Sequence, residues 1–122
     1  MREEQELSEL VEELREYSAD YPIIVEGPKD VKALDRAGIK SIPYEGSIIE
    51  YSEKIKEKYP NTNRVLILTD YDKAGEELRI MLKNALSRLG IEEDIKLRLK
   101  FKRITRLSHI EGFRIDASSV DH

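Results

Sequence analysis

The stretch 65–78, VLILTDYDKAGEEL, joins a short apolar run to two aspartates and then to a helical pattern. Four consecutive apolar residues, 65–68, are typical of a strand buried on both faces. Asp70 and Asp72 follow at once, and their side chains point to the same side because residues i and i+2 of an extended segment do so. Two aspartates in this position either cap the next helix or belong to a metal site. A metal site requires further ligands elsewhere in the chain.

Extended and helical patterns alternate along the rest of the sequence. Residues 1–20 carry an apolar stripe with glutamates on the other face, which predicts an N-terminal amphipathic helix. The predicted strands are 21–27, 39–46, 64–70 and 94–102, and the other predicted helices are 28–37, 47–59 and 73–89. Strands that alternate with helices predict an α/β fold, a parallel sheet of about four strands flanked by helices. We expect the N-terminal helix (1–20) to pack on one domain (21–103), followed by a C-terminal extension (104–122).

The composition limits the class of protein. The 122 residues contain no cysteine, and 38% of them are charged, as is common in proteins of hot-living organisms. Disulfides are excluded, which fits a cytoplasmic protein. No stretch approaches the roughly 18 apolar residues of a membrane span, so we expect no membrane association.

A third carboxylate completes the candidate metal site. Glu26 ends the first predicted strand, and if the first and third strands are neighbours it lies beside Asp70. Ligands of open α/β sheets bind beyond the carboxyl ends of the strands, where these side chains would gather. Two carboxylates 4 Å apart repel by about 4 kcal/mol at an effective dielectric of 20. A cation bound by Glu26, Asp70 and Asp72 would offset this repulsion, and hard oxygen ligands select Mg²⁺ or Mn²⁺.

Lysines begin two of the predicted helices, where the helix dipole disfavours positive charge. Lys29 and Lys73 either balance the neighbouring acids or reach for a phosphate.

Basic residues alternate with apolar ones in the last predicted strand. Lys96, Arg98 and Lys100 would share its exposed face. Such a face suits the phosphates of a nucleic acid, but lysines also protect solvated sheet edges from aggregation. His109 and His122 have no partner at ligand spacing, so we expect them to be surface residues.

Two motifs resemble the Toprim domain, the catalytic module of topoisomerases, bacterial-type primases, a ribosomal-RNA maturase and several nucleases. They are Glu26-Gly27-Pro28-Lys29-Asp30, after the first strand, and Asp70-Tyr71-Asp72-Lys73-Ala74-Gly75-Glu76, after the third. The version with Ala74 is most similar to the 5S ribosomal RNA maturase and small nucleases, because topoisomerases and primases commonly have a glutamate there. Small proteins that consist largely of this domain occur in prokaryotes, notably archaea.

The resemblance implies Mg²⁺-dependent chemistry on nucleic-acid phosphodiesters, in a nuclease or an RNA- or DNA-processing enzyme. Glu26 would act as a general acid/base, and Asp70 and Asp72 would hold the metal. We expect no second domain that would supply the tyrosine nucleophile of a topoisomerase. A protein partner or a homodimer would add surface for recognising the substrate. The candidate substrate-binding residues are Gly27, Lys29, Asp30, Lys73, Gly75, Lys96, Arg98 and Lys100.

Other classes of protein fit the pattern less well. A non-catalytic Toprim module that binds nucleic acid or protein within a larger complex would bind metal without turnover. A phosphoacceptor receiver domain also gathers acids at two strand ends, but it needs five strand–helix units and an acidic pair after the first strand. A haloacid-type phosphatase places its Asp-x-Asp motif after the first strand.

Overall fold

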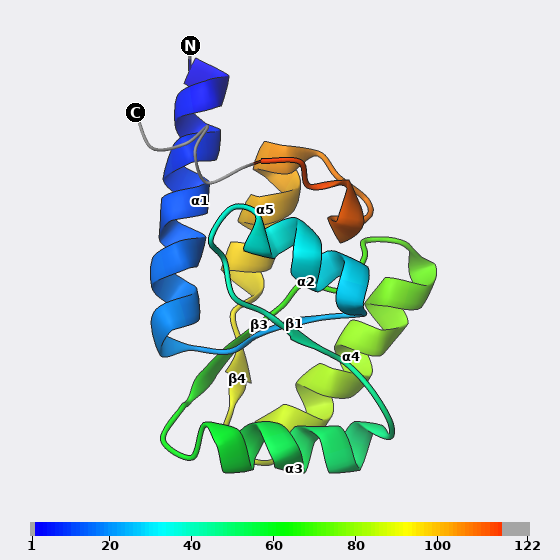
Figure 1. Cartoon of the computed structure of the whole chain (residues 1–122). Coiled ribbons are helices and arrows are strands. Elements are labelled where there is room, and N and C mark those ends of the chain that lie inside the picture. Colours follow the sequence, from blue (N-terminus) through cyan, green and yellow to red (C-terminus); the bar gives the residue numbers. More distant parts are fainter. Residues whose placement is uncertain (1, 116–122) are drawn as a thin grey trace.

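Residues 2–115, which the computed structural model describes, form a four-stranded parallel sheet flanked by helices (Figure 1). The strands are β1 (Ile23–Val25), β2 (Ile42–Pro43), β3 (Arg64–Ile67) and β4 (Glu92–Glu93). The helices are α1 (Arg2–Asp20), α2 (Pro28–Asp35), α3 (Ile48–Lys58), α4 (Lys73–Ser87), α5 (Ile95–Thr105) and the 3₁₀ turn η1 (Ile110–Gly112). The predicted α/β class is confirmed.

The strand order β2-β1-β3-β4 makes β1 and β3 neighbours, as the prediction required. In the parallel ladders, Ile24 of β1 lies opposite Ile42 of β2 and Ile67 of β3. Parallel strands end at the same edge of a sheet, so the segments after β1 and β3 emerge side by side.

The two faces of the sheet contribute to two separate apolar clusters. Leu66 and Leu68 pack with side chains of α1, α2 and α5, whereas Val65 and Ile67 pack with side chains of α3 and α4. Successive side chains of a strand point to opposite faces. Both faces are therefore covered, which explains why residues 65–68 are apolar without a break.

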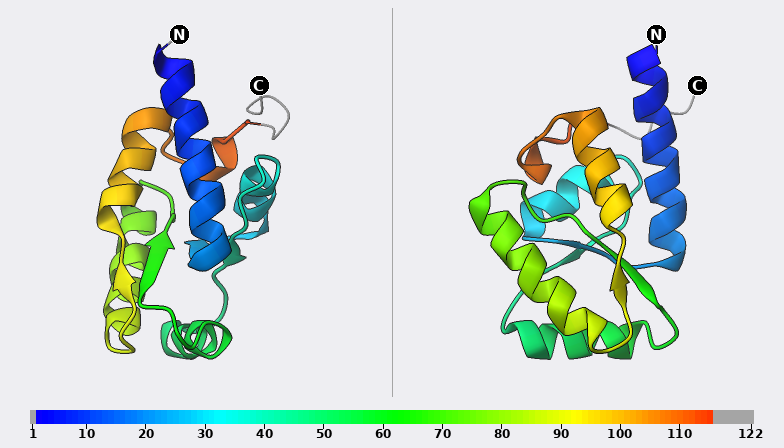
Figure 2. Two further views of the ribbon diagram at one scale, coloured as in Figure 1. Left: turned by 90° about the vertical axis from the view of Figure 1, so that its left-hand side faces the viewer. Right: turned by 180° about the vertical axis from the view of Figure 1, so that it is seen from behind.

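The predicted amphipathic helix α1 is confirmed, and it runs alongside α5 (Figure 2). Its buried side chains are Leu10, Val11, Leu14 and Tyr17. Two polar contacts join α1 to the domain. Glu13 forms an ion pair with Lys100 Nζ at 2.7 Å, and Arg15 Nε donates a hydrogen bond to the Ala37 carbonyl oxygen at 2.6 Å. No helix among residues 2–115 is both long and apolar enough to cross a membrane.

The strand predicted at 94–102 is wrong, because residues 95–105 form α5 and only Glu92 and Glu93 pair with β3. The Asp94 side chain accepts a hydrogen bond from the Leu97 N–H at 3.1 Å, a typical helix N-cap. Lys, Leu and Arg are good helix formers. The helix buries Leu97, Arg98 and Phe101, so the alternation of 95–101 arose from a helical stripe that was too short to distinguish from a strand.

The C-terminal segment turns back to the domain after α5. Arg106 has φ 60°, in the left-handed region, and its N–H bonds to the Lys102 carbonyl. Buried Ile110 and Phe113 then pack in the α1–α2–α5 cluster, and η1 lies against α2. His122 and the end of the predicted extension lie outside the described residues.

Candidate metal centre

Glu26, Asp70 and Asp72 lie at the carboxyl-end edge of the sheet, on the loops after β1 and β3. Glu26 Oε1 accepts a hydrogen bond from the Asp70 N–H at 3.0 Å. This single bond joins two loops that are 44 residues apart in the sequence. The predicted adjacency of the two acidic motifs is therefore confirmed.

The loop that carries the aspartates is closed at the start of α4. Asp72 caps this helix, since its Oδ1 accepts the Gly75 N–H at 2.8 Å. The buried Thr69 hydroxyl donates to the Gly75 carbonyl oxygen at 2.8 Å. A Cβ atom on Gly75 would lie 1.9 Å from the Asp70 carbonyl oxygen, so glycine is needed for this close approach. Asp72 thus caps its helix and still leaves Oδ2 for other contacts.

A buried arginine of α5 binds the backbone of the loop that carries Asp70. Arg98 is 1% exposed, and its guanidinium donates to the carbonyl oxygens of Ile67, Thr69 and Asp70 at 3.0, 2.7 and 3.2 Å. It also pairs with Glu76 Oε1 at 2.6 Å and stacks 4.0 Å from the centre of the Tyr71 ring. Arginine can donate five N–H groups in a fixed planar arrangement, which suits a set of converging carbonyls. Arg98 therefore fixes the backbone from which Asp70 projects.

The C-terminal segment after α5 also contacts the loop that carries Asp70. The Ile110 N–H donates to Asp70 Oδ1 at 2.9 Å, and the Tyr71 N–H donates to the Ser108 carbonyl oxygen at 2.8 Å. His109 Nδ1 lies 3.3 Å from Asp70 Oδ2 and 3.9 Å from Asp72 Oδ2. One ligand atom from each of Asp70, Asp72 and His109 falls within 4.8 Å of the others.

The charges at this edge change the proton affinities of several groups. Burial, opposed by the Asp70 N–H and reinforced by the charges of Asp70 and Asp72, raises the pKa of Glu26 above its ordinary 4.5. Burial likewise raises the pKa of Asp30, whose Oδ2 accepts the Gly27 N–H at 3.1 Å. The hydrogen bond to Asp70 raises the pKa of the exposed His109 imidazole. Burial is thus the main cause for the two carboxyl groups, and the neighbouring negative charges act in the same direction on all three groups.

The donor set fits a divalent cation. Asp70 and Asp72 offer carboxylate oxygens, the ligands preferred by Mg²⁺ and Mn²⁺, and the His109 imidazole suits Mn²⁺ better than Mg²⁺. Glu26 is not one of this group of three, although its carboxylate adjoins Asp70. The arrangement therefore separates a group that could hold a metal ion, after β3, from the Glu26 carboxylate after β1.

The remaining predicted residues divide into three groups. Gly27 and Asp30 build the N-terminus of α2, and Gly75 builds that of α4. Lys29, Lys73 and Lys96 are exposed. The predicted basic face is wrong, because Arg98 is buried and Lys100 pairs with Glu13.

Sequence reasoning missed the contributions from beyond residue 104. His109, expected only at the surface, is exposed but contacts both aspartates, and Ile110 acts through its backbone. No local spacing signals a contact across 40 residues. The role of Arg98 could have been found, because Leu97, Phe101 and Ile104 have the i, i+4, i+7 spacing of a helix.

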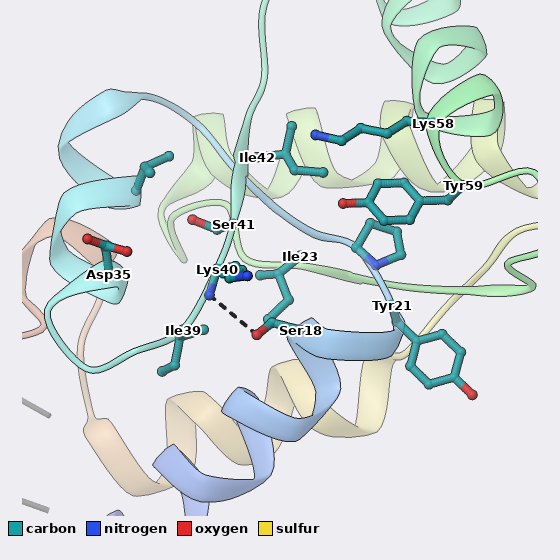
Figure 3. A pocket seen from close by; sticks show the side chains of 12 residues that line it. Ser18, Tyr21, Ile23, Asp35, Ile39, Lys40, Ser41, Ile42, Lys58 and Tyr59 are labelled. Atoms are coloured by element: carbon teal, nitrogen blue, oxygen red, sulfur yellow. Dashed lines mark hydrogen bonds between the residues drawn. The ribbon is translucent and has the colours of Figure 1, made fainter.

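A separate cavity of about 290 Å³ lies near the opposite edge of the sheet, at the start of β1 and β2 (Figure 3). Ser41, Lys58 and Tyr59 are among its lining residues. It contains none of the acidic motif residues. Open α/β sheets bind ligands at the carboxyl ends of their strands, so the acidic edge remains the favoured site.

Comparison with known proteins places the acidic motifs in a family. The Toprim domain model matches residues 22–104. A UPF0292 protein of Methanosarcina barkeri is 36% identical over 104 residues, covering 82% of this chain and 71% of the relative. A UPF0292 protein of Archaeoglobus fulgidus is 28% identical over 125 residues, covering 93% of each chain. A solved structure of a protein from Aquifex aeolicus has 30% identity and a TM-score of 0.75, covering 87% of this chain and 96% of that one.

The matched range includes both acidic motifs and the sheet that brings them together. Toprim domains typically bind a divalent metal and generally act on nucleic acids, which agrees with the Asp70, Asp72 and His109 group. The curated relatives are archaeal, as the sequence suggested. The chain belongs to the Toprim family and is a relative of the archaeal UPF0292 proteins.

Proposed function

We propose that this protein is a Mg²⁺-dependent enzyme, with Mn²⁺ as an alternative metal, that cleaves or processes nucleic-acid phosphodiesters. The observation that carries the proposal is the convergence of Glu26 with Asp70 and Asp72 across neighbouring strand ends, joined by the 3.0 Å bond between Glu26 Oε1 and the Asp70 N–H. The Toprim match supports the same chemistry.

The three carboxylates take different roles in this proposal. Asp70 and Asp72 would hold the metal, and a bound divalent cation neutralises charge on the phosphodiester and orients the attacking oxygen. Asp70 would bind through Oδ2, because Oδ1 accepts the Ile110 N–H. Asp72 would likewise use Oδ2, because Oδ1 caps α4. The fold thus leaves one oxygen of each aspartate facing the site.

Glu26 would move the proton. Its Oε1 accepts the Asp70 N–H, so Oε2 is the atom that would exchange a proton with the attacking or leaving oxygen. A general acid/base works best when its pKa approaches the operating pH, and the pKa of Glu26 is raised by burial and by the neighbouring acids. Two carboxylates in unequal surroundings commonly divide acid/base and electrostatic roles in this way.

A cleavage assay with matched variants tests the proposal. Fluorescent single- and double-stranded RNA and DNA are incubated with Mg²⁺, Mn²⁺ or EDTA. We expect metal-dependent products from the natural chain, and at least a hundredfold slower cleavage by Glu26→Gln and by Asp70→Asn, given that general acid/base catalysis typically contributes about 10²–10⁴-fold. Cleavage by either variant at the natural rate would overturn the assignment. Metal and nucleic-acid binding without turnover would instead identify a binding module.

A further inference from the structure

Four basic side chains line a cleft between α2 and the segment that follows η1. Lys29 and Lys32 come from α2, Arg36 is the C-cap of that helix, and Arg114 comes from the C-terminal segment, with Glu111 of η1 as the one acidic lining residue. We call this the α2 cleft. Its volume is about 240 Å³, and four cations against one carboxylate give it a net charge of +3. All five residues are exposed.

The helix presents its three cations along one line. Lys29, Lys32 and Arg36 have i, i+3, i+7 spacing, so they share a face of α2 and span about 10 Å along its axis. Like charges at these spacings destabilise a helix, and Lys29 also lies at the dipole's positive end. Among residues 2–115, none of the three forms an ion pair. The dipole favours cations at the other end of α2, where Lys32 lies in the last turn and Arg36 is the C-cap, so only Lys29 stands where the dipole disfavours its charge.

The α2 cleft adjoins the candidate metal centre. Lys29 stands three residues after Glu26, in the first turn of α2, where the Asp30 side chain accepts the N–H of the N-cap Gly27. Across the cleft, Glu111 follows Ile110, whose N–H binds Asp70. The charges of Asp70 and Glu111 both raise the pKa of Asp30, so Asp30 lies near residues of both sites. Both walls of the cleft are therefore close along the chain to residues of the candidate metal centre.

We propose that the α2 cleft binds the phosphate backbone of a nucleic-acid strand, next to the phosphodiester that Asp70 and Asp72 face. This inference rests on the proposed function and adds the path of the substrate to it. The row of cations is roughly 10 Å long, so it can contact more than one phosphate of a strand at once. Contacts to phosphates position a strand without reading its sequence. The cleft therefore binds RNA and DNA of any sequence.

The salt dependence of binding tests the α2 cleft. Fluorescence anisotropy measures the Kd of labelled RNA and DNA of about 12 nucleotides for the full chain, in EDTA to prevent cleavage. The salt concentration is varied from about 50 to about 200 mM, a range over which binding through phosphate contacts weakens steeply. The variant Lys32→Ala/Arg36→Ala removes the two cations farthest from Glu26. We expect about tenfold weaker binding, equal for different sequences, and a slope of log K against log salt that is smaller by about 2.

The control removes the same charge elsewhere. Lys54→Ala/Lys83→Ala changes two exposed lysines of α3 and α4, and it should bind like the natural chain. Equal Kd values and equal slopes for the cleft variant and this control would overturn the proposal that the α2 cleft binds nucleic acid. The cleavage assay would still test the proposed function separately. Absence of metal-independent binding by the natural chain would also overturn it. Unchanged melting temperatures of both variants would exclude loss of folding as the cause.

Discussion

The two strand ends that carry the acidic motifs are held in different ways. After β3, the loop of Asp70 is fixed by the Arg98 guanidinium, the Ile110 N–H and the closure at Gly75. After β1, Glu26 makes one hydrogen bond to the Asp70 N–H, and no cationic side chain among residues 2–115 lowers its pKa. The difference teaches that one half of the candidate site is held by contacts from several segments. The other half keeps a carboxylate in surroundings that favour its protonated form.

The largest expected effect comes from removing the arginine beneath the Asp70 loop. Arg98→Met leaves three carbonyl oxygens without their donor, while the half-exposed Glu76 keeps Arg79. Each buried acceptor left unsatisfied typically costs about 1–3 kcal/mol, so we expect a loss of about 3–5 kcal/mol. Arg98→Lys should restore only part, because an ammonium cannot reach all four acceptors at once. Urea unfolding measures the loss. A loss below 1 kcal/mol for Arg98→Met (against the ~3–5 kcal/mol expected) would show that the loop does not depend on this contact.

Two glycines give a smaller effect and a direct comparison of the two strand ends. Gly75→Ala forces a Cβ onto the Asp70 carbonyl, and overpacking of this kind typically costs about 1–3 kcal/mol. Gly27→Ala meets nothing within 4 Å and has an extended φ of −158°. Gly27→Ala should lower the free energy of unfolding by less than about 1 kcal/mol, the usual effect of alanine at an N-cap. Equal losses of unfolding free energy in the two variants would contradict the contrast between the ends.

The smallest expected effect is the pH response of Glu26. A raised pKa in the folded state means that the contribution of this group to stability is fully present below its unfolded pKa of about 4.5, and is lost as pH rises through the folded value. In EDTA, Glu26→Gln should therefore melt higher than the natural chain at pH 7, and the advantage should shrink as the pH falls toward 4 (about the unfolded glutamate pKa). Melting curves across this range measure it. An advantage that grows on acidification would contradict the raised pKa.

The fold could be predicted from sequence because its main signals are local. The apolar run at 65–68, the glycines that end helices and the strand-end acids all lie within a few residues of the features they specify. The strand order then followed from general rules for parallel sheets, and it placed Glu26 beside Asp70.

The remaining parts of the site depend on contacts between distant segments. His109 and Ile110 reach Asp70 only because α5 is a helix and the chain reverses at Arg106. Reading 95–101 as a strand removed that path and placed Arg98 on a solvent-exposed face. Seven residues of alternating apolar and basic side chains fit both periods, and the cap at Asp94 is what distinguishes them.

The most direct test of the central claim is the melting temperature of the natural chain and of Asp70→Asn, each in EDTA, Mg²⁺ and Mn²⁺. The asparagine amide oxygen can still accept the Ile110 N–H, so the variant should keep its fold while losing a charged metal ligand. We predict a rise with either cation for the natural chain, since a ligand that binds the folded state stabilises it, and no rise for Asp70→Asn. The same rise in both proteins, or none in the natural chain, would contradict a metal centre at Asp70.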